Sequence, residues 1–209
     1  GDLAVSTDTM VENVHFRRDW SSAADVGRKA VAACVADAEA MGAVPVGLVL
    51  SLAAPASTPA AWVEEFAGGV RAECERAGVR LVGGDTTSAP QVVVTATVLA
   101  DLGGLPPLTR AGARPGQVLA MAGRLGWAAA GVAVLARGFR SPRAAVVAHR
   151  VPEVPYGEGR VAAEAGASAL IDISDGLIAD LGHVARPSRA TPHADTPTLQ
   201  PAAPPQPAP

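Results

Sequence analysis

Five aspartates in this sequence stand where an unpaired carboxylate is unfavourable, and their placement indicates one shared chemical role. Asp8 follows a short apolar run, Asp37 lies among apolar residues of an expected helix, and Asp85 closes a Gly-Gly-Asp sequence at an expected strand end. Asp172 and Asp175 stand where an expected strand meets an expected helix. A carboxylate in apolar surroundings is costly unless it is paired or binds a metal. Because strand ends gather at one edge of a sheet, we expect these side chains to converge.

The candidate ligands are oxygen donors, and the sequence has no His or Cys pairs at the spacings of a zinc site. Carboxylates combined with water and phosphate oxygens suit Mg²⁺, so the pattern predicts a magnesium and nucleotide-phosphate site. Gly83 and Gly84 would let backbone amides approach phosphate oxygens closely. No nucleophile with a paired base is evident, which favours direct in-line phosphoryl transfer.

Each motif also has an ordinary structural explanation when it is taken alone. Residues 6–8 could form a turn or a cap, residues 83–85 a loop, and residues 172–176 a helix cap. His15, which precedes an aromatic residue, could be structural, and Arg110 could be a solvated charge. None of these explanations accounts for all the motifs occurring together in this order.

The elements expected to position these residues in the first half of the chain alternate between strands and helices. Leu3 to Ser6 reads as the end of a strand, and the apolar spacing predicts a helix from a cap at 19–22 to about Met41. Thr58-Pro59 predicts the start of a second helix, which Gly78 ends. Further strands are expected over the β-branched runs at Val44–Ala53, Val79–Val82 and Gln91–Leu99.

Glycines and prolines at 103–107 predict a domain boundary, so we expect an N-terminal ATP- and magnesium-binding α/β domain over residues 1–104. An incomplete second α/β domain is expected over 105–186. Its predicted strands are 118–122 and 169–173, and its predicted helices are 127–137, 142–150 and 177–185, with Ser174 as the cap of the last. From 187 to 209 Pro, Ala and Thr dominate, which predicts a disordered tail.

Composition excludes several classes of function. The chain has 209 residues, 49% of them hydrophobic, and a net charge of -3 without a basic stretch, so nucleic-acid binding is not indicated. Two cysteines, Cys34 and Cys74, are too few for a disulfide framework, and we expect both to be small core residues. We find no signal peptide or membrane-spanning stretch, so we expect a cytoplasmic protein with no membrane partner.

Taken together, the motifs closely resemble thiamine-monophosphate kinase, a family within the ATP-binding superfamily that includes aminoimidazole ribonucleotide synthetase. The resemblance runs from about residue 3 to 186. The matching segments are Val5–Glu12 with His15-Phe16, the helix of Asp37 followed by Ala40–Ala43, Gly83–Thr87, Leu108–Ala113 with Pro115-Gly116, Gly123–Gly126, Ile171–Leu177 and Asp180–His183.

This resemblance implies an α/β fold like that of aminoimidazole ribonucleotide synthetase, whose N-terminal strands pair across a homodimer. It implies transfer of the terminal phosphate of ATP onto thiamine monophosphate, giving thiamine diphosphate. By resemblance, several Mg²⁺ ions would be held by Ser6, Thr7, Asp8, Asp37, Asp85, Asp172 and Asp175. ATP would contact Gly84, Asp85, Arg110 and Ser174, the thiamine substrate would contact His15, and Asp8, Asp85 and Arg110 would be catalytic.

Three departures from the family pattern lead us to expect a chain truncated at both ends, with weak or no turnover. The family has a Gly-Asp-Asp block well before Ser6, which the early Gly1-Asp2 does not replace. Cys34 stands in place of an Asn that is usual three positions before the helix aspartate. The Pro-rich tail stands where the family continues its second domain.

Two alternatives remain open at the level of sequence. The chain could be another ATP-binding enzyme of the same superfamily, or an inactive nucleotide-binding or dimerisation fragment. For the dimer, we expect Val92–Leu99 to be an edge strand able to pair with another chain.

Overall fold

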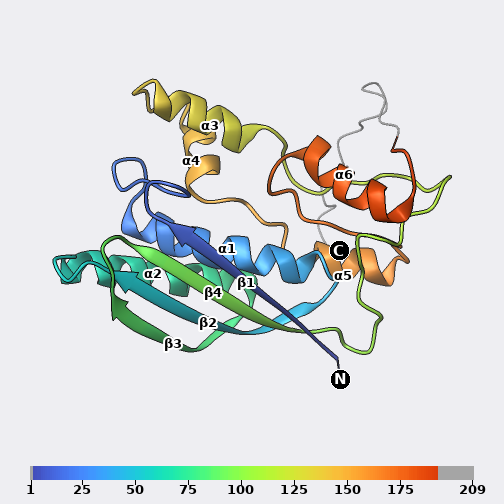
Figure 1. The fold of residues 1–209 in the computed structure, drawn as a ribbon, viewed down its shortest axis with the longest axis horizontal. Coiled ribbons are helices and arrows are strands. Elements are labelled where there is room, and N and C mark those ends of the chain that lie inside the picture. Colours follow the sequence, from blue (N-terminus) through green and yellow to red (C-terminus); the bar gives the residue numbers. More distant parts are fainter. Residues whose placement is uncertain (1, 193–209) are drawn as a thin grey trace, which may run out of the picture.

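The computed structural model describes residues 2–192, and its N-terminal half is a four-stranded sheet with two helices on one face. Figure 1 shows both helices on the same side of the strands. The strands are β1 (Leu3–Val11), β2 (Val44–Ala54), β3 (Arg80–Ser88) and β4 (Val93–Asp101), and the helices are α1 (Ala23–Glu39) and α2 (Ala60–Ala77). This mixed sheet with helices confirms the predicted α/β class.

The strand order is β1-β4-β2-β3, with β4 antiparallel to both of its neighbours and β2 parallel to β3. The prediction that residues 92–99 form an edge strand is therefore wrong, because β4 lies inside the sheet and β1 and β3 are its edges. Two strands also run further than predicted. Asp8 lies within β1 and Asp85 within β3, since ladder hydrogen bonds continue past the expected ends at Ser6 and Val82.

The two helices begin and end at recognisable signals. The Ser22 side chain accepts from the Asp25 N–H and the Asp25 carboxylate accepts from the Ser22 N–H, which is a capping box at the start of α1. Helix α2 begins at Ala60, one residue later than Thr58-Pro59 predicts, because Pro59 takes the N-cap position. Gly78, at φ 66°, ends α2 in the left-handed conformation as predicted.

The two faces of the sheet differ in burial. On the helix side, alternate residues of β4 are buried with the apolar side chains of α1 and α2, and they form the core. The opposite face carries no helix of the described chain, and it leaves large apolar side chains exposed. Among these are Leu3, Val5 and Val49. Large apolar side chains on the outer face of a sheet are typical of a sheet that another layer covers.

The second half of the described chain contains helices and no strand. They are α3 (Trp127–Ala136), α4 (Arg143–Arg150), α5 (Glu158–Glu164) and α6 (Leu177–Ser188). The predicted strands at 118–122 and 169–173 are wrong, because neither apolar run has a paired strand beside it. Helix α6 ends at Ser188, so the predicted tail starts inside a helix, and its part at 193–209 lies outside the described residues.

Buried carboxylates on the N-terminal helices hold the second half in place. Glu39, at the end of α1, accepts hydrogen bonds from the backbone N–H groups of Gly157 at 2.9 Å and Gly159 at 3.0 Å. Arg160 donates to the Leu102 carbonyl at 2.9 Å. These contacts fix the start of α5 against α1, so the loops that flank it face the N-terminal layer. Within residues 2–192, no helix combines the length and apolar character that crossing a membrane requires.

Candidate functional site

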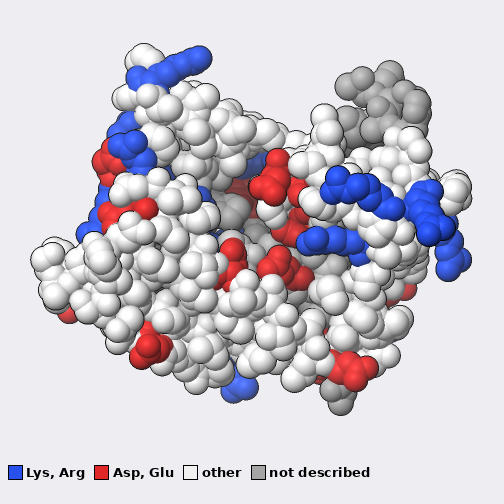
Figure 2. Space-filling view, in the orientation of Figure 1, with Lys and Arg blue, Asp and Glu red and all other residues white. Residues whose placement is uncertain are grey.

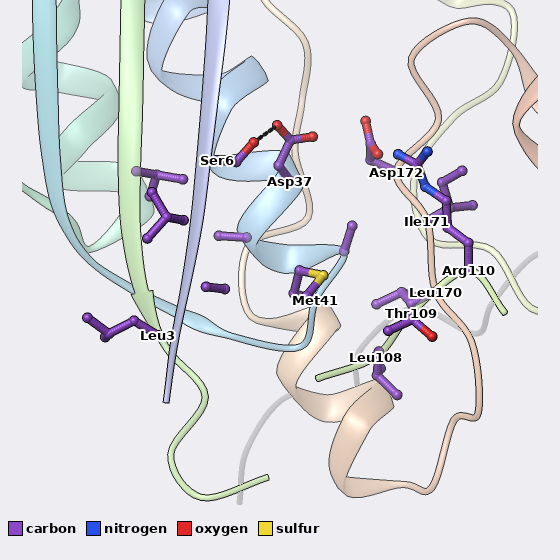
Figure 3. Close-up of a pocket in the computed structure, with 15 residues that line it drawn as sticks. Leu3, Ser6, Asp37, Met41, Leu108, Thr109, Arg110, Leu170, Ile171 and Asp172 are labelled. Carbon is purple, nitrogen blue, oxygen red and sulfur yellow. Dashed lines mark hydrogen bonds between the residues drawn. The ribbon is translucent and has the colours of Figure 1, made fainter. Parts of the chain in front are cut away.

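A cleft of about 410 Å³ lies between the N-terminal layer and the loops of the second half (Figure 3). One wall is formed by β1 and the C-terminal part of α1, and the other by residues 108–110 and 170–172. The polar groups that reach it are Ser6 and Asp37 on the first wall and Arg110 and Asp172 on the second. The cleft therefore brings together four predicted site residues from four separate segments of the chain.

Asp37 is the central acid of this cleft. The Ser6 hydroxyl donates to its carboxylate at 2.5 Å, and both side chains point toward the cleft in Figure 3. Burial raises the pKa of Asp37, and the negative charges of Asp172 and Asp8 raise it further, while the Ser6 hydrogen bond and Arg110 oppose the change. Several carboxylates thus repel one another here, and a bound cation would relieve that repulsion.

The loop on the second wall is shaped by internal hydrogen bonds. The Ser174 hydroxyl donates to the Asp172 carboxylate, and the Asp180 carboxylate accepts from the backbone N–H groups of Asp175 and Gly176, both at 3.0 Å. The prediction that Ser174 caps α6 is wrong, because Gly176 is the N-cap and Asp180 satisfies the free N–H groups. The sequence analysis included Asp180 in a matching segment but assigned it no role, although an acid in the first turn of a helix is a recognised signal.

Two of the predicted metal ligands lie on the other face of the sheet. Residues paired across neighbouring strands point to the same side, and Asp85 pairs with Ser51, which pairs with Thr95. Thr7 pairs with Thr97, and the two hydroxyls are 2.9 Å apart on this same face. Ser6 and Asp8 alternate with Thr7 and face α1 instead. Within one chain, Asp85 and Thr7 are therefore not brought to the cleft of Asp37.

The packing of β2 against β3 requires glycine at position 84. A Cβ atom at this position would lie 2.1 Å from the carbonyl oxygen of Leu50 in the neighbouring strand, whereas one at Gly83 would meet nothing within 4 Å. A side chain at residue 84 would force β2 and β3 apart. Close strand packing therefore requires glycine at this position, independently of any phosphate.

His15 lies in the turn after β1, near a basic residue that sequence reasoning missed. The His15 Nδ1 atom accepts from the Val11 N–H at 3.0 Å, and Lys29 donates to the His15 carbonyl at 2.9 Å. Burial lowers the pKa of Lys29, and the charge of Asp8 opposes that change. Lys29 stands two helical turns before Asp37 on α1, so helical spacing could have found it.

Cys34 packs α1 against the sheet. Its side chain is fully buried, and Sγ lies 3.3 Å from the Ala96 carbonyl oxygen and 3.7 Å from that of Ser6. Burial raises the pKa of this thiol to about 12. As predicted, Cys34 and Cys74 are buried core residues.

The donor set suits Mg²⁺, although the ligands are not assembled around one point. Across residues 2–192, no three His, Cys, Asp or Glu side chains lie close enough to hold one ion. Figure 2 shows acidic side chains gathered around a hollow in the middle of the molecular surface that it displays. Basic side chains lie on the right-hand side of this hollow. Hard oxygen donors around an acid with a raised pKa fit a divalent cation bound together with water and phosphate.

Comparison with known proteins identifies the class of fold. Residues 1–101, which hold the whole sheet with α1 and α2, match the family described as AIR synthase related protein, N-terminal domain. Over a longer stretch, the chain is similar to thiamine-monophosphate kinases. It is 48% identical to the thiamine-monophosphate kinase of Mycobacterium tuberculosis (strain ATCC 25618 / H37Rv) over 188 residues, covering 90% of this chain and 56% of the relative.

Two further relatives are similar to the chain over most of its length. The chain is 41% identical to the thiamine-monophosphate kinase of Corynebacterium glutamicum over 203 residues, covering 94% of this chain and 61% of the relative. The solved structure of AaThiL complexed with AMPPCP and TMP superposes with a TM-score of 0.83 at 30% identity, covering 90% of this chain and 60% of that one. The chain thus spans between 56% and 61% of the length of these relatives.

Proposed function

We propose that this chain binds ATP with Mg²⁺ and transfers the terminal phosphate to thiamine monophosphate, giving thiamine diphosphate. The observation that carries the proposal is the position of Asp37, which faces Asp172 and Arg110 across one cleft and is influenced by Asp8. The relatives support it, because they are thiamine-monophosphate kinases and one was solved with AMPPCP, an ATP analogue, and TMP.

The metal ligands on one wall would be Ser6, Asp8 and Asp37, and those on the other wall would be Asp172 and Asp175. Bound Mg²⁺ would neutralise phosphate charge in the cleft. Arg110 would contact the nucleotide phosphates, since a guanidinium can make two parallel hydrogen bonds to phosphate oxygens. Positioning and charge neutralisation are most of what direct phosphoryl transfer needs from a protein, so no further nucleophile is required.

Three other residues would position the substrates. Ser174, beside Asp172, and the backbone at Gly84 would contact ATP. His15 would contact the thiamine substrate. Because its Nδ1 accepts the Val11 N–H, the neutral ring of His15 carries its proton on Nε2, which is free to donate to a ligand.

We also propose that the chain is a homodimer, and the uncovered sheet face supports this. That face exposes Leu3, Val5 and Val49, and such an apolar surface is typical of an interface. Edges β1 and β3 have unpaired backbone groups within the described chain. If β3 of one copy pairs with β1 of the other, Asp85 of one copy lies on the same sheet face as Thr7 of its neighbour, in the strand beside the one that carries Asp8. The site would then be completed by two copies.

Mixing two variants tests this shared site. Asp8→Asn and Asp85→Asn chains should each lose Mg-dependent binding of AMPPCP. When the two are co-expressed, half of the dimers are mixed, and each mixed dimer has one intact site, so about a quarter of the binding capacity should return. No recovery, or a monomer in analytical ultracentrifugation, would overturn the dimer proposal while leaving the single-chain cleft untouched.

Incubation with Mg-ATP and thiamine monophosphate, followed by measurement of thiamine diphosphate, tests the reaction. Calorimetry with AMPPCP tests the binding step separately. Asp37→Asn should weaken Mg-dependent nucleotide binding by about tenfold or more, since changes even to outer partners of a metal site cost about that much. Asp101→Asn, at the end of β4 and outside the cleft, is the matched control. Binding that is unchanged in Asp37→Asn would contradict the proposed site.

We place the protein in the cytoplasm, where its two thiols stay reduced.

A further inference from the structure

A second cleft, of about 720 Å³, lies between the first turns of α1 and helix α4, apart from the acidic cleft. Its charged lining consists of four arginines and one aspartate, which are Arg28, Arg140, Arg143 and Arg150, and Asp25. Three valines of α4 and the residue after it provide its apolar part. In Figure 2, basic side chains gather along the left edge of the molecule, the side on which α4 lies in Figure 1.

Most of this positive charge is not neutralised by the described residues. Arg28 pairs with buried Glu73 at 2.9 Å, but Arg143 has no ion pair within residues 2–192. Arg140 donates to two backbone carbonyls and to no carboxylate of the described chain. Arg150 reaches Asp25 only at 3.9 Å, and its buried Nε has no hydrogen-bond partner. Asp25 is thus the one carboxylate that lines the cleft beside Arg140, Arg143 and Arg150.

A neutral histidine lies beside the cleft. His149, next to Arg150 on α4, packs edge-on against Trp20 with 5.9 Å between ring centroids. Burial lowers the pKa of His149 to about 4, and the nearby charges of Lys29 and Arg150 lower it further. The ring is therefore neutral at pH 7 and adds no charge. In a chain of net charge -3, this concentration of cations is local.

We propose that this cleft is a second, metal-independent site that binds the phosphate groups of a small molecule. Guanidinium groups match phosphate oxygens with paired, charge-assisted hydrogen bonds, and a buried Nε without a partner favours an acceptor. The volume lies within the about 300 to 1,000 Å³ typical of small-molecule pockets. The valines would contact an apolar part of the same ligand. The acidic cleft differs, because phosphate can approach its carboxylates only together with cations.

Calorimetric titration of the full chain with inorganic diphosphate in EDTA isolates this site, since chelation removes the metal that the acidic cleft needs. We expect saturable binding that weakens as salt rises, because the contacts are between exposed charges. Arg143→Gln and Arg140→Gln should each weaken it by about tenfold, the loss of one charge-assisted contact. Arg71→Gln, an exposed arginine of α2 that lines neither cleft, is the matched control and should leave binding unchanged.

Thermal melting of each variant confirms that the fold is retained. The absence of diphosphate binding in EDTA overturns the proposal, as does binding to both cleft variants that is as strong as binding to the unchanged chain. Binding of a single-stranded oligonucleotide without binding of diphosphate also overturns it, because the surface would then recognise a nucleic-acid backbone. Each result is independent of the phosphoryl transfer proposed above, which is measured with Mg²⁺ present.

Discussion

The Tyr156 hydroxyl donates a 2.8 Å hydrogen bond to the carboxylate of Glu73, whose side chain is fully buried. The same carboxylate accepts from Arg28 of α1 at 2.9 Å and from Arg76 of α2 at 2.5 Å. One acid therefore joins both N-terminal helices to the segment that leads into α5. Together with the Glu39 contacts at the start of α5, it holds the second half against the layer that carries Asp37.

Removing the Tyr156 hydroxyl should loosen this junction. We expect Tyr156→Phe to lower the free energy of unfolding by about 1 kcal/mol, the net value of one hydrogen bond, because the ring can still pack against Arg76. Glu73→Gln should cost more, about 2 to 4 kcal/mol, since it leaves two arginines without their shared charge. Urea unfolding measures both. The exposed Glu75→Gln on the same helix is the control, and an equal loss there would contradict the role of Glu73.

The ionised carboxylate of Asp37 should lower the free energy of unfolding at pH 7. Its pKa is raised in the folded chain, so the folded state binds this proton more tightly than the unfolded chain does. Ionised Asp37 therefore disfavours folding above its folded pKa, and the cost disappears below the unfolded value of about 3.9. Asp37→Asn should thus raise the free energy of unfolding at pH 7 by a fraction of the about 1.4 kcal/mol that one pKa unit represents, since half-burial leaves some screening by water.

Melting curves of Asp37→Asn and of the unchanged chain at pH 7 and at pH 4 measure this gain. The advantage of Asp37→Asn should shrink as pH falls, without magnesium or nucleotide present. A variant that is less stable at pH 7 would show that the carboxylate is needed for the fold, through its bond to Ser6.

The sequence alone predicted the helix boundaries that depend on residues close together in the chain. The Ser22 cap and the apolar spacing of α1, and Gly78 at the end of α2, follow from short-range rules. The alternation in β4 also predicted a strand, but its central position could not be predicted, because strand order depends on contacts between distant segments. The strand predicted from the apolar run at 169–173 is absent for the same reason. A strand needs a neighbouring strand to pair with, and the spacing of apolar residues does not reveal whether one is present.

The candidate site shows the same division. The motifs predicted that Asp8, Asp37 and Asp172 act together, and the structure brings the last two to one cleft and the first near it. They did not predict that Asp85 points to the opposite face, because the expected strand ended before it. Its direction is set by the register of β3 against β2 over several residues. Asp85 remains a proposed ligand, to be supplied across the dimer.

Both thiols should be unreactive in the folded chain. Burial raises the pKa of Cys34 to about 12 and that of Cys74 to about 11, so almost no thiolate exists at pH 8. We expect no reaction with a disulfide reagent such as DTNB under native conditions within the time that unfolded chain takes to react completely. The number of thiols released after adding guanidinium chloride provides the reference. Rapid labelling of one thiol in the native protein would mean that α1 or α2 opens locally.

Gly83 and Gly84 are neighbours with opposite predicted sensitivity. In Gly84→Ala, the new methyl group would lie 2.1 Å from the Leu50 carbonyl oxygen, so β2 and β3 must separate, and we expect a loss of about 1 to 3 kcal/mol. Gly83→Ala is the matched control, because its methyl group meets nothing within 4 Å. It should change stability little or raise it slightly by restricting the unfolded chain. Thermal unfolding without nucleotide separates this packing role from phosphate binding. Equal melting temperatures for the two variants would show that β3 can shift away from β2 at no cost.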